Sequence, residues 1–350
     1  MVQILLELMM DAMKNKFQST KTLCNFIHKV FFILLLTNTT YSQNYISYQT
    51  KINKCESFIL KKEYNNAINY YDSIFNSYNF CFAQDYFVAL QVSCYINDTI
   101  KAVGYIKKCL KAGVKINYIT TDSITKKICT NKFIQNRIEN IDSLIFKYYQ
   151  SIDINYRGFL MELTSIDQYY RDKHQVIHTF HPLRKLIWNK RWKKEINELV
   201  ENRLITKIIK LGYPGEKLIG LKEKWMLSKY KTNGLGDVTA LLIFRHYYSF
   251  KNTDYSNLLL EELLKGNITS NQYAIIMDYT SKFGNADNYY NQWHNDPDNS
   301  NDNLNRINAK RIKIGLELLD EYNLKFSRAI KVNRGVKNLP IEFYFKLLLI

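Results

Sequence analysis

The chain has 350 residues, a length that suits two modest domains rather than one small core. Hydrophobic residues make up 46% and aromatic residues 14%, which excludes a chain that is disordered throughout. The 49 basic residues outnumber the 32 acidic residues, for a net charge of +17, and there are only 12 glycines and four prolines. This composition excludes collagen-like repeats, flexible low-complexity linkers, β-propellers and small disulfide-rich folds. All four prolines lie after residue 181, so the front half can form nearly unbroken helices.

Residues 1–42 have the organisation of a secretory signal peptide. Four lysines precede the apolar run at 30–36, and a small-x-small cleavage site ends at Ser42. Seven apolar residues in a helix span about 10 Å, too little for a membrane core of about 30 Å. We therefore expect export to the periplasm or the extracellular side of the envelope, with a mature chain that begins near Gln43. The alternatives are a buried helix or an uncleaved anchor, and residues 1–12 are a candidate start-site artefact.

Five cysteines follow this segment, namely Cys55, Cys81, Cys94, Cys109 and Cys129. No CxxC spacing occurs, so neither a thioredoxin-like motif nor a zinc ribbon is indicated. In an exported protein these thiols can form up to two disulfides, and in helices they can equally pack as small apolar residues. We expect at least one disulfide, although the spacing does not identify the pair.

Segment 43–115 predicts two helical hairpins. An offset of 35 residues aligns Ala67-Ile68 with Ala102-Val103, and apolar residues then recur at i+3, i+4 and i+7 in both copies. Each copy is preceded by another apolar helix, at about 48–60 and about 82–95. The pattern resembles the tetratricopeptide repeat, which has a period of about 34 residues. Two repeats are too few for a free-standing solenoid, so we expect the hairpins to pack against the segments that follow.

The rest of the chain is also predicted to be helical. Residues 116–157 continue as a helical connector, and a new organisation begins at 158 and extends to 324. The tail at 325–350 is basic and then apolar, which suits a groove cover, a membrane-surface contact or a disordered end. The predicted fold class is therefore all-α, with tetratricopeptide-like hairpins followed by a helical C-terminal domain.

Residues 158–324 contain five short motifs in a fixed order. They are Asp167-Gln168-x-x-Arg171, Gly212-x-Pro-Gly215, His246 at the end of an apolar helix, Ala274-x-x-x-Asp278, and Arg311-x-x-x-Gly315-Leu316. Together they resemble DUF6624, a bacterial family of domains of unknown function found in Bacteroidota. The resemblance implies a helical domain in which Asp167, Gln168 and Arg171 are polar motif residues, and it implies no known reaction. The chain departs from the family pattern at Tyr279, where the family favours Arg.

Three of these motif residues suggest chemistry. A histidine oriented by a carboxylate is the base half of a hydrolytic site, so His246 and Asp278 are candidate catalytic residues. Arg311 could bind a carboxylate or a phosphate with two hydrogen bonds. The alternative is a buried structural network in which the same groups satisfy one another. No GxSxG elbow, phosphate-binding loop or HExxH motif favours an enzyme, so enzymatic activity stays uncertain.

The sequence patterns that could indicate a metal site are weaker than the catalytic candidates. His174, His178 and His181 have the spacing of one helix face, but a solvated polar helix explains them better than a metal site. Residues 296–302 alternate oxygen-bearing side chains like a calcium loop, yet the glycine and the closing acid are missing. We predict no metal and no cofactor.

One stretch concentrates positive charge. Residues 184–194 contain six basic residues interleaved with Trp188 and Trp192: Arg184, Lys185, Lys190, Arg191, Lys193 and Lys194. This pattern suits an anionic partner, and it also suits a solvated amphipathic helix. No nucleic-acid-binding fold signature accompanies it, so nucleic acid is not an expected partner, and any membrane contact should be peripheral.

Two functions from different classes fit the sequence. The first is a non-enzymatic interaction or scaffold protein of the bacterial envelope, whose hairpins bind a protein or peptide partner. The second is a hydrolase-like enzyme with a His246 and Asp278 site. They differ in one geometric respect, because the enzyme needs these side chains together in an open cleft.

Overall fold

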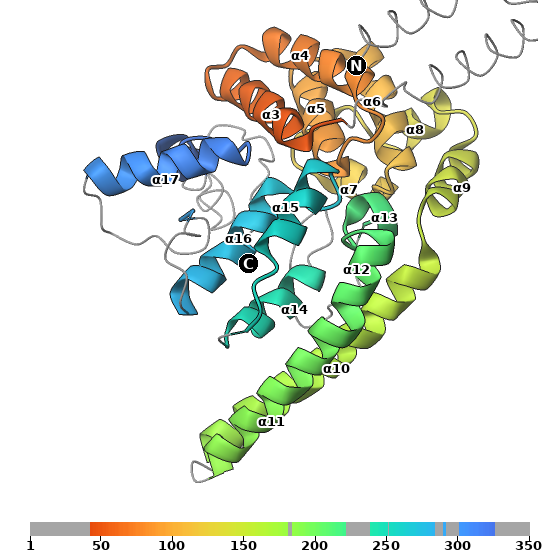
Figure 1. Ribbon diagram of the computed structural model, residues 1–350. Helices are drawn as coiled ribbons and strands as arrows, with labels where there is room; N and C mark the ends of the chain where they lie inside the picture. Colours follow the sequence, from red (N-terminus) through yellow and green to blue (C-terminus); the bar gives the residue numbers. More distant parts are fainter. Residues whose placement is uncertain are drawn as a thin grey trace, which may run out of the picture. The chain divides into compact units, whose positions relative to one another are not determined.

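The computed structural model describes residues 43–180, 184–221, 239–250, 252–283, 290–291 and 301–325. These residues form helices joined by turns and contain no strand, so the predicted all-α class is confirmed (Figure 1). The predicted signal segment and the tail beyond residue 325 lie outside the described residues.

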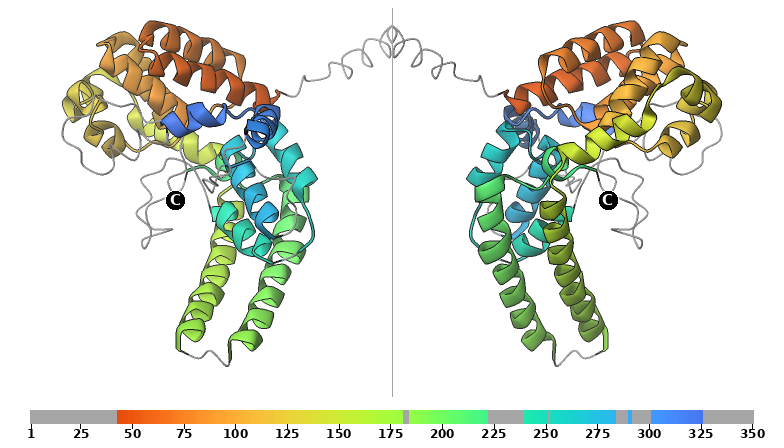
Figure 2. Two further views of the ribbon diagram at one scale, coloured as in Figure 1. Left: turned by 90° about the vertical axis from the view of Figure 1, so that its left-hand side faces the viewer. Right: turned by 90° about the vertical axis from the view of Figure 1, so that its right-hand side faces the viewer.

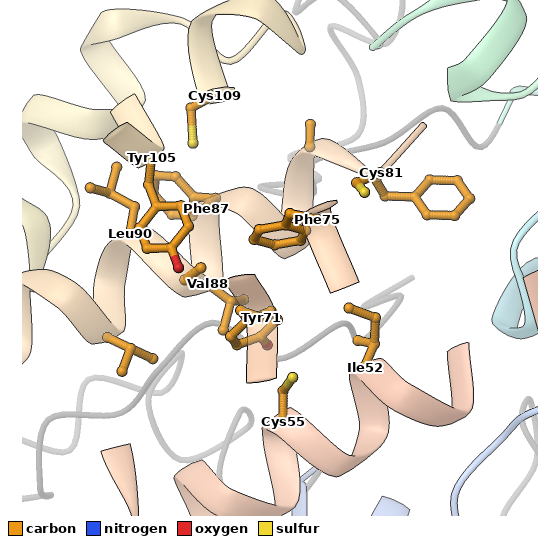
Figure 3. Close-up of a cluster of buried hydrophobic side chains, with 14 of the residues drawn as sticks. Ile52, Cys55, Tyr71, Phe75, Cys81, Phe87, Val88, Leu90, Tyr105 and Cys109 are labelled. Carbon is orange, nitrogen blue, oxygen red and sulfur yellow. The ribbon is translucent and has the colours of Figure 1, made fainter. Parts of the chain in front are cut away.

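The front of the described chain consists of two helical hairpins. Helices α3 (Tyr45–Leu60) and α4 (Tyr64–Ser77) form the first, and α5 (Ala83–Tyr95) and α6 (Thr99–Lys111) form the second. The predicted apolar stripes of α4 and α6 are buried, and Figure 3 shows Tyr71 and Phe75 from α4 in the same buried cluster as Phe87, Val88 and Leu90 from α5. The apolar periodicity therefore located these helices and their buried faces correctly.

The connector is not one helix. It is divided into α7 (Ile116–Thr121), a 3₁₀ turn η1 (Thr125–Lys127), α8 (Asn131–Arg137) and α9 (Ile141–Ser151). Two of the breaks have a visible local feature. Asp122 accepts hydrogen bonds from the backbone N–H groups of Ile124 and Thr125, and Asn140 has a left-handed φ of 53°. The Asp122 side chain thus competes with the helical backbone for N–H donors, and an apolar stripe alone does not reveal that competition.

Two long helical segments follow and run antiparallel, side by side. Helix α10 (Ile154–Phe180) packs against α11 (Lys185–Asn197), and α11 continues through a π-helical stretch, η3 (Glu198–Leu204), into α12 (Ile205–Leu211) (Figure 2). We call the part of this pair formed by residues 166–180 and 184–194 the arm. A short helix, α13 (Glu216–Ile219), comes after the Gly212-Tyr-Pro-Gly215 turn.

The remaining helices complete a second hydrophobic core. They are α14 (Thr239–Tyr248), α15 (Ser256–Leu264), α16 (Ser270–Phe283) and α17 (Asn301–Lys313), and residues 319–325 form one more helical segment. This core gathers side chains of α10, η3, α14 and α16, including Leu163, Val200, Phe244 and Met277. None of the described helices is long and apolar enough to cross a membrane.

The hairpins pack against the C-terminal half, as we expected. Asn53 on α3 donates from Nδ2 to the carbonyl oxygen of Gly315 at 2.8 Å. The backbone N–H of Ala83, at the start of α5, donates to Glu216 at 2.6 Å. Side chains from beyond residue 300, such as Leu319 and Tyr322, join the hydrophobic core of the hairpins. The hairpins and the C-terminal half are therefore parts of one unit, whose described residues begin at Asn44.

Candidate functional site

His246 near the end of α14 is paired with a carboxylate from α10. Its Nδ1 lies 2.8 Å from both oxygens of Asp167, which is 79 residues earlier in the chain. The Asp167 side chain is fully buried, whereas the imidazole keeps a small exposed fraction of 17%. Because a carboxylate only accepts hydrogen bonds, Nδ1 is the donor in this pair.

The other residues of the first motif extend this pair along α10. Gln168 donates from Nε2 to Asp167 at 2.8 Å, and Arg171 donates to Gln168 Oε1 at 3.1 Å. The Trp192 ring of α11 packs edge-on to His246, with ring centroids 5.8 Å apart. Asp167, Gln168 and Arg171 thus form one hydrogen-bonded chain with His246, which links α10 to α14.

Asp278 and Arg311 belong to a different cluster. Asp278 accepts a hydrogen bond from the backbone N–H of Tyr290 at 2.5 Å, and Arg311 donates to the carbonyl oxygen of the same residue at 2.9 Å. Arg311 also donates to the Glu317 carbonyl at 2.7 Å and lies over the Tyr322 ring. Both side chains are buried, and burial lowers the pKa of Arg311 from its usual value. In the structure the carboxylate beside His246 is that of Asp167, whereas Asp278, the partner considered from the sequence, lies in this second cluster.

The three histidines with helix-face spacing are described only in part. His174 hydrogen-bonds through Nε2 to Asn189 and packs on Trp192, so it faces α11. The side chains of His178 and His181 and residues 296–300 lie outside the described residues, and residues 301 and 302 begin α17. Among the described residues, no group of three or more His, Cys, Asp or Glu side chains is placed to hold a metal ion.

A small cavity lies between the second hairpin and α9. Leu110, Tyr148 and Leu221 are among the residues that line it, and its volume is about 60 Å³. Pockets for small-molecule ligands usually measure about 300 to 1,000 Å³, so this cavity has room for a few water molecules only.

The basic stretch falls on α11 and divides into two faces. Asn189 and Trp192 turn toward α10 and α14, as their contacts with His174 and His246 show. The outward face carries exposed side chains at i, i+3, i+4 and i+7: Ile187, Lys190, Arg191 and Lys194. Leu186 and Ile187 are 73% and 69% exposed, and Arg184 just before the helix is also exposed. The side chain of Lys185 lies outside the described residues, and Lys193 is half-buried.

The five cysteines after the signal segment are all buried free thiols. The structure therefore contains none of the disulfides that the sequence allows among them. Two of the five, Cys94 and Cys129, nevertheless have their sulfur atoms in contact at 3.4 Å. No motif marks this pair in the sequence, because the two residues are 35 positions apart on different elements.

The fold and these sites define a class: an all-α protein in which two helical hairpins pack on a larger helical body with an exposed basic arm. Compared with family models, curated proteins and solved structures, the chain matches none of them. The similarity to DUF6624 and to tetratricopeptide repeats therefore stays a prediction from the sequence motifs.

Proposed function

We propose that this protein is a non-enzymatic, exported scaffold of the bacterial envelope that docks on an anionic membrane surface through the outward face of α11. The observation that carries the proposal is the combination of exposed Leu186 and Ile187 with exposed cations on the same helix. Interfacial helices of proteins that bind membrane surfaces combine apolar and basic side chains in this way.

The charges suit such a partner. Arg184, Lys190, Arg191 and Lys194 are exposed on or beside this face, and each Lys or Arg near an anionic membrane contributes about 1 kcal/mol. Leu186 and Ile187 precede Lys190 and Arg191 by about one turn, so they can enter the headgroup region while the cations contact phosphates. Lipid phosphates and acyl chains together satisfy both kinds of side chain.

Two further observations favour this surface over the alternatives. The hairpin helices expected to bind a peptide use Asn53, Glu56 and the start of α5 for contacts with the chain's own C-terminal half. The groups expected to form a hydrolase site lie in two separate hydrogen-bonded clusters, around Asp167 and around Tyr290. The arm, in contrast, exposes apolar and basic side chains that are available to a partner.

The test is flotation with lipid vesicles. We expect the full chain to float with vesicles rich in phosphatidylglycerol, to ignore pure phosphatidylcholine vesicles, and to lose binding when salt rises from about 0.1 M to about 0.5 M. The double substitution Lys190→Glu/Arg191→Glu should weaken binding by about tenfold or more, because it removes two attractions and adds two repulsions. Leu186→Ser/Ile187→Ser should weaken it without changing the net charge.

The matched control is Lys126→Glu/Lys127→Glu, which makes the same charge change at two exposed lysines of η1. This variant should still bind. Equal loss in both charge variants would mean non-specific attraction of a basic protein, and would contradict the proposal. Absence of vesicle binding, or retention on an acidic protein instead of lipid, would also overturn it.

A further inference from the structure

The thiols of Cys94 and Cys129 meet in the interior of the hairpin region. Their Sγ atoms are 3.4 Å apart, and the two residues are 3% and 0% exposed. A disulfide bond is about 2.05 Å long, so the sulfurs need to approach by little more than 1 Å. No other pair among the five described cysteines shows a sulfur–sulfur contact.

The two residues lie on segments that share one hydrophobic core and a hydrogen bond. Cys94 lies in the last turn of α5, and Cys129 follows η1. We call residues 116–129 the strap. Gln91 of α5 donates to Asp122 of the strap at 3.1 Å, and the Cys129 N–H donates to the Thr125 carbonyl at 2.8 Å. A bond between the sulfurs would fix the end of the strap to the end of α5.

We propose that Cys94 and Cys129 form a redox-active pair, which a disulfide-bearing oxidant such as oxidised glutathione converts to a disulfide. One cysteine thiolate attacks a sulfur of the oxidant and releases its other sulfur as a thiolate. The second cysteine thiolate then attacks the protein sulfur of the mixed disulfide and releases the remaining thiolate. The protein loses two protons and two electrons, and the oxidant's disulfide becomes two thiols.

The contact also couples the ionisation of the two thiols. A hydrogen bond from the Cys94 thiol lowers the pKa of Cys129 despite its burial, and the same hydrogen bond raises the pKa of Cys94. Because both are buried, exchange takes place while the strap is open, either during folding or in a locally opened state.

The disulfide should stabilise the protein. It would close a loop between residues that are 35 positions apart and so reduce the conformational entropy of the unfolded chain. The expected gain is a rise in Tm of roughly 5 to 10 °C. This inference does not depend on the proposed membrane function, and neither result bears on the other.

The experiment is a disulfide map of the full chain. Samples are incubated with reduced or oxidised glutathione in a low concentration of urea that opens the strap, then alkylated, digested without reduction and analysed by mass spectrometry. We expect a cross-linked peptide containing Cys94 and Cys129 in the oxidised sample only, with Cys55 and Cys81 alkylated in both. The Tm should be higher in the oxidised sample.

Cys94→Ser and Cys129→Ser should each abolish the redox-dependent rise in Tm, and the control Cys81→Ser, which replaces another buried thiol, should keep it. Alkylation of both Cys94 and Cys129 after oxidation would overturn the proposal. A cross-link from either of them to Cys109 instead would overturn it as well. The peptide map of the unmodified chain decides the question even if a serine variant does not fold.

Discussion

Gly215 shows how tightly the Gly-x-Pro-Gly turn is packed. A Cβ at this position would lie 1.9 Å from the carbonyl oxygen of Asn267, which is backbone and cannot rotate away. The φ of Gly215 is −96°, which any residue can adopt, so the requirement is for space and not for an unusual backbone. The neighbouring Tyr213 N–H donates to the buried carboxylate of Glu262 at 2.6 Å, and this bond fixes the turn against α15.

We therefore expect Gly215→Ala to lower the free energy of unfolding by about 2 kcal/mol or more, since the added methyl group forces the turn away from Asn267. The matched control is Gly104→Ala inside α6, where a Cβ meets nothing within 4 Å. That change should raise stability by about 0.5 to 1 kcal/mol, because alanine favours helix over glycine. Urea unfolding followed by circular dichroism measures the free energy of unfolding of both variants. A Gly215→Ala protein as stable as the Gly104→Ala protein would contradict the packing argument.

At the scale of elements, the Asp167–His246 pair ties α10 to α14. Asp167 accepts hydrogen bonds from His246 and from Gln168, and its side chain is fully buried. We expect Asp167→Asn to cost about 1 to 3 kcal/mol of stability, because the amide keeps only one acceptor and turns a donor toward another donor.

The control for this prediction lies on the same helix. Glu162 pairs with Arg203 at 2.7 Å, but the two side chains are 58% and 36% exposed. Glu162→Gln should therefore cost less than about 1 kcal/mol. Thermal unfolding of both variants measures the difference between their losses of stability. Equal effects would mean that the Asp167 pair does not hold the two helices together.

The helices themselves were predictable because their signals are local. The stripes beginning at Ala67 and Ala102 define α4 and α6, and Gly212 ends α12 with a φ of 96°, where a glycine was expected to follow the helix. The pairing of side chains between helices was not predictable. His246 has carboxylates available on several helices, and the packing of α14 against α10 selects Asp167 over Asp278. The same limit applies to Cys94 and Cys129, whose contact depends on the path of the strap.

At the scale of the whole molecule, a buried ion cluster joins the first helix of the hairpins to the helical segment at residues 319–325. Lys325 donates to Glu56 of α3 at 2.6 Å and lies 3.7 Å and 3.6 Å from Glu317 and Glu321. Burial alone lowers the pKa of Lys325, but the three carboxylates outweigh it and keep the pKa above its usual value. The side chains of Lys325 and Glu56 are 1% and 3% exposed, so this contact is out of reach of solvent.

Removal of this lysine should therefore weaken the joint between the two halves. We expect Lys325→Met to cost about 3 kcal/mol or more near pH 8, because three carboxylates then lose their common cation and Glu56 stays buried. Burial already raises the pKa of Glu56, against the opposing effect of Lys325, and the substitution should raise it further. An acid whose pKa is raised by folding gains stability as the pH falls through that raised value. The cost of Lys325→Met should therefore shrink between pH 8 and pH 5.

Urea unfolding at pH 8 and pH 5 measures the stability cost of Lys325→Met and shows whether that cost falls or rises on acidification. Lys101→Met is the matched control, because it breaks a pair with Asp72 in which the side chains are 31% and 40% exposed. It should cost less than about 1 kcal/mol at either pH. The double variant Glu56→Gln/Lys325→Met should recover part of the loss, since it removes the buried charge that the lysine had balanced. A cost that matches that of Lys101→Met, or one that grows on acidification, would show that the cluster does not hold the hairpins to the C-terminal half.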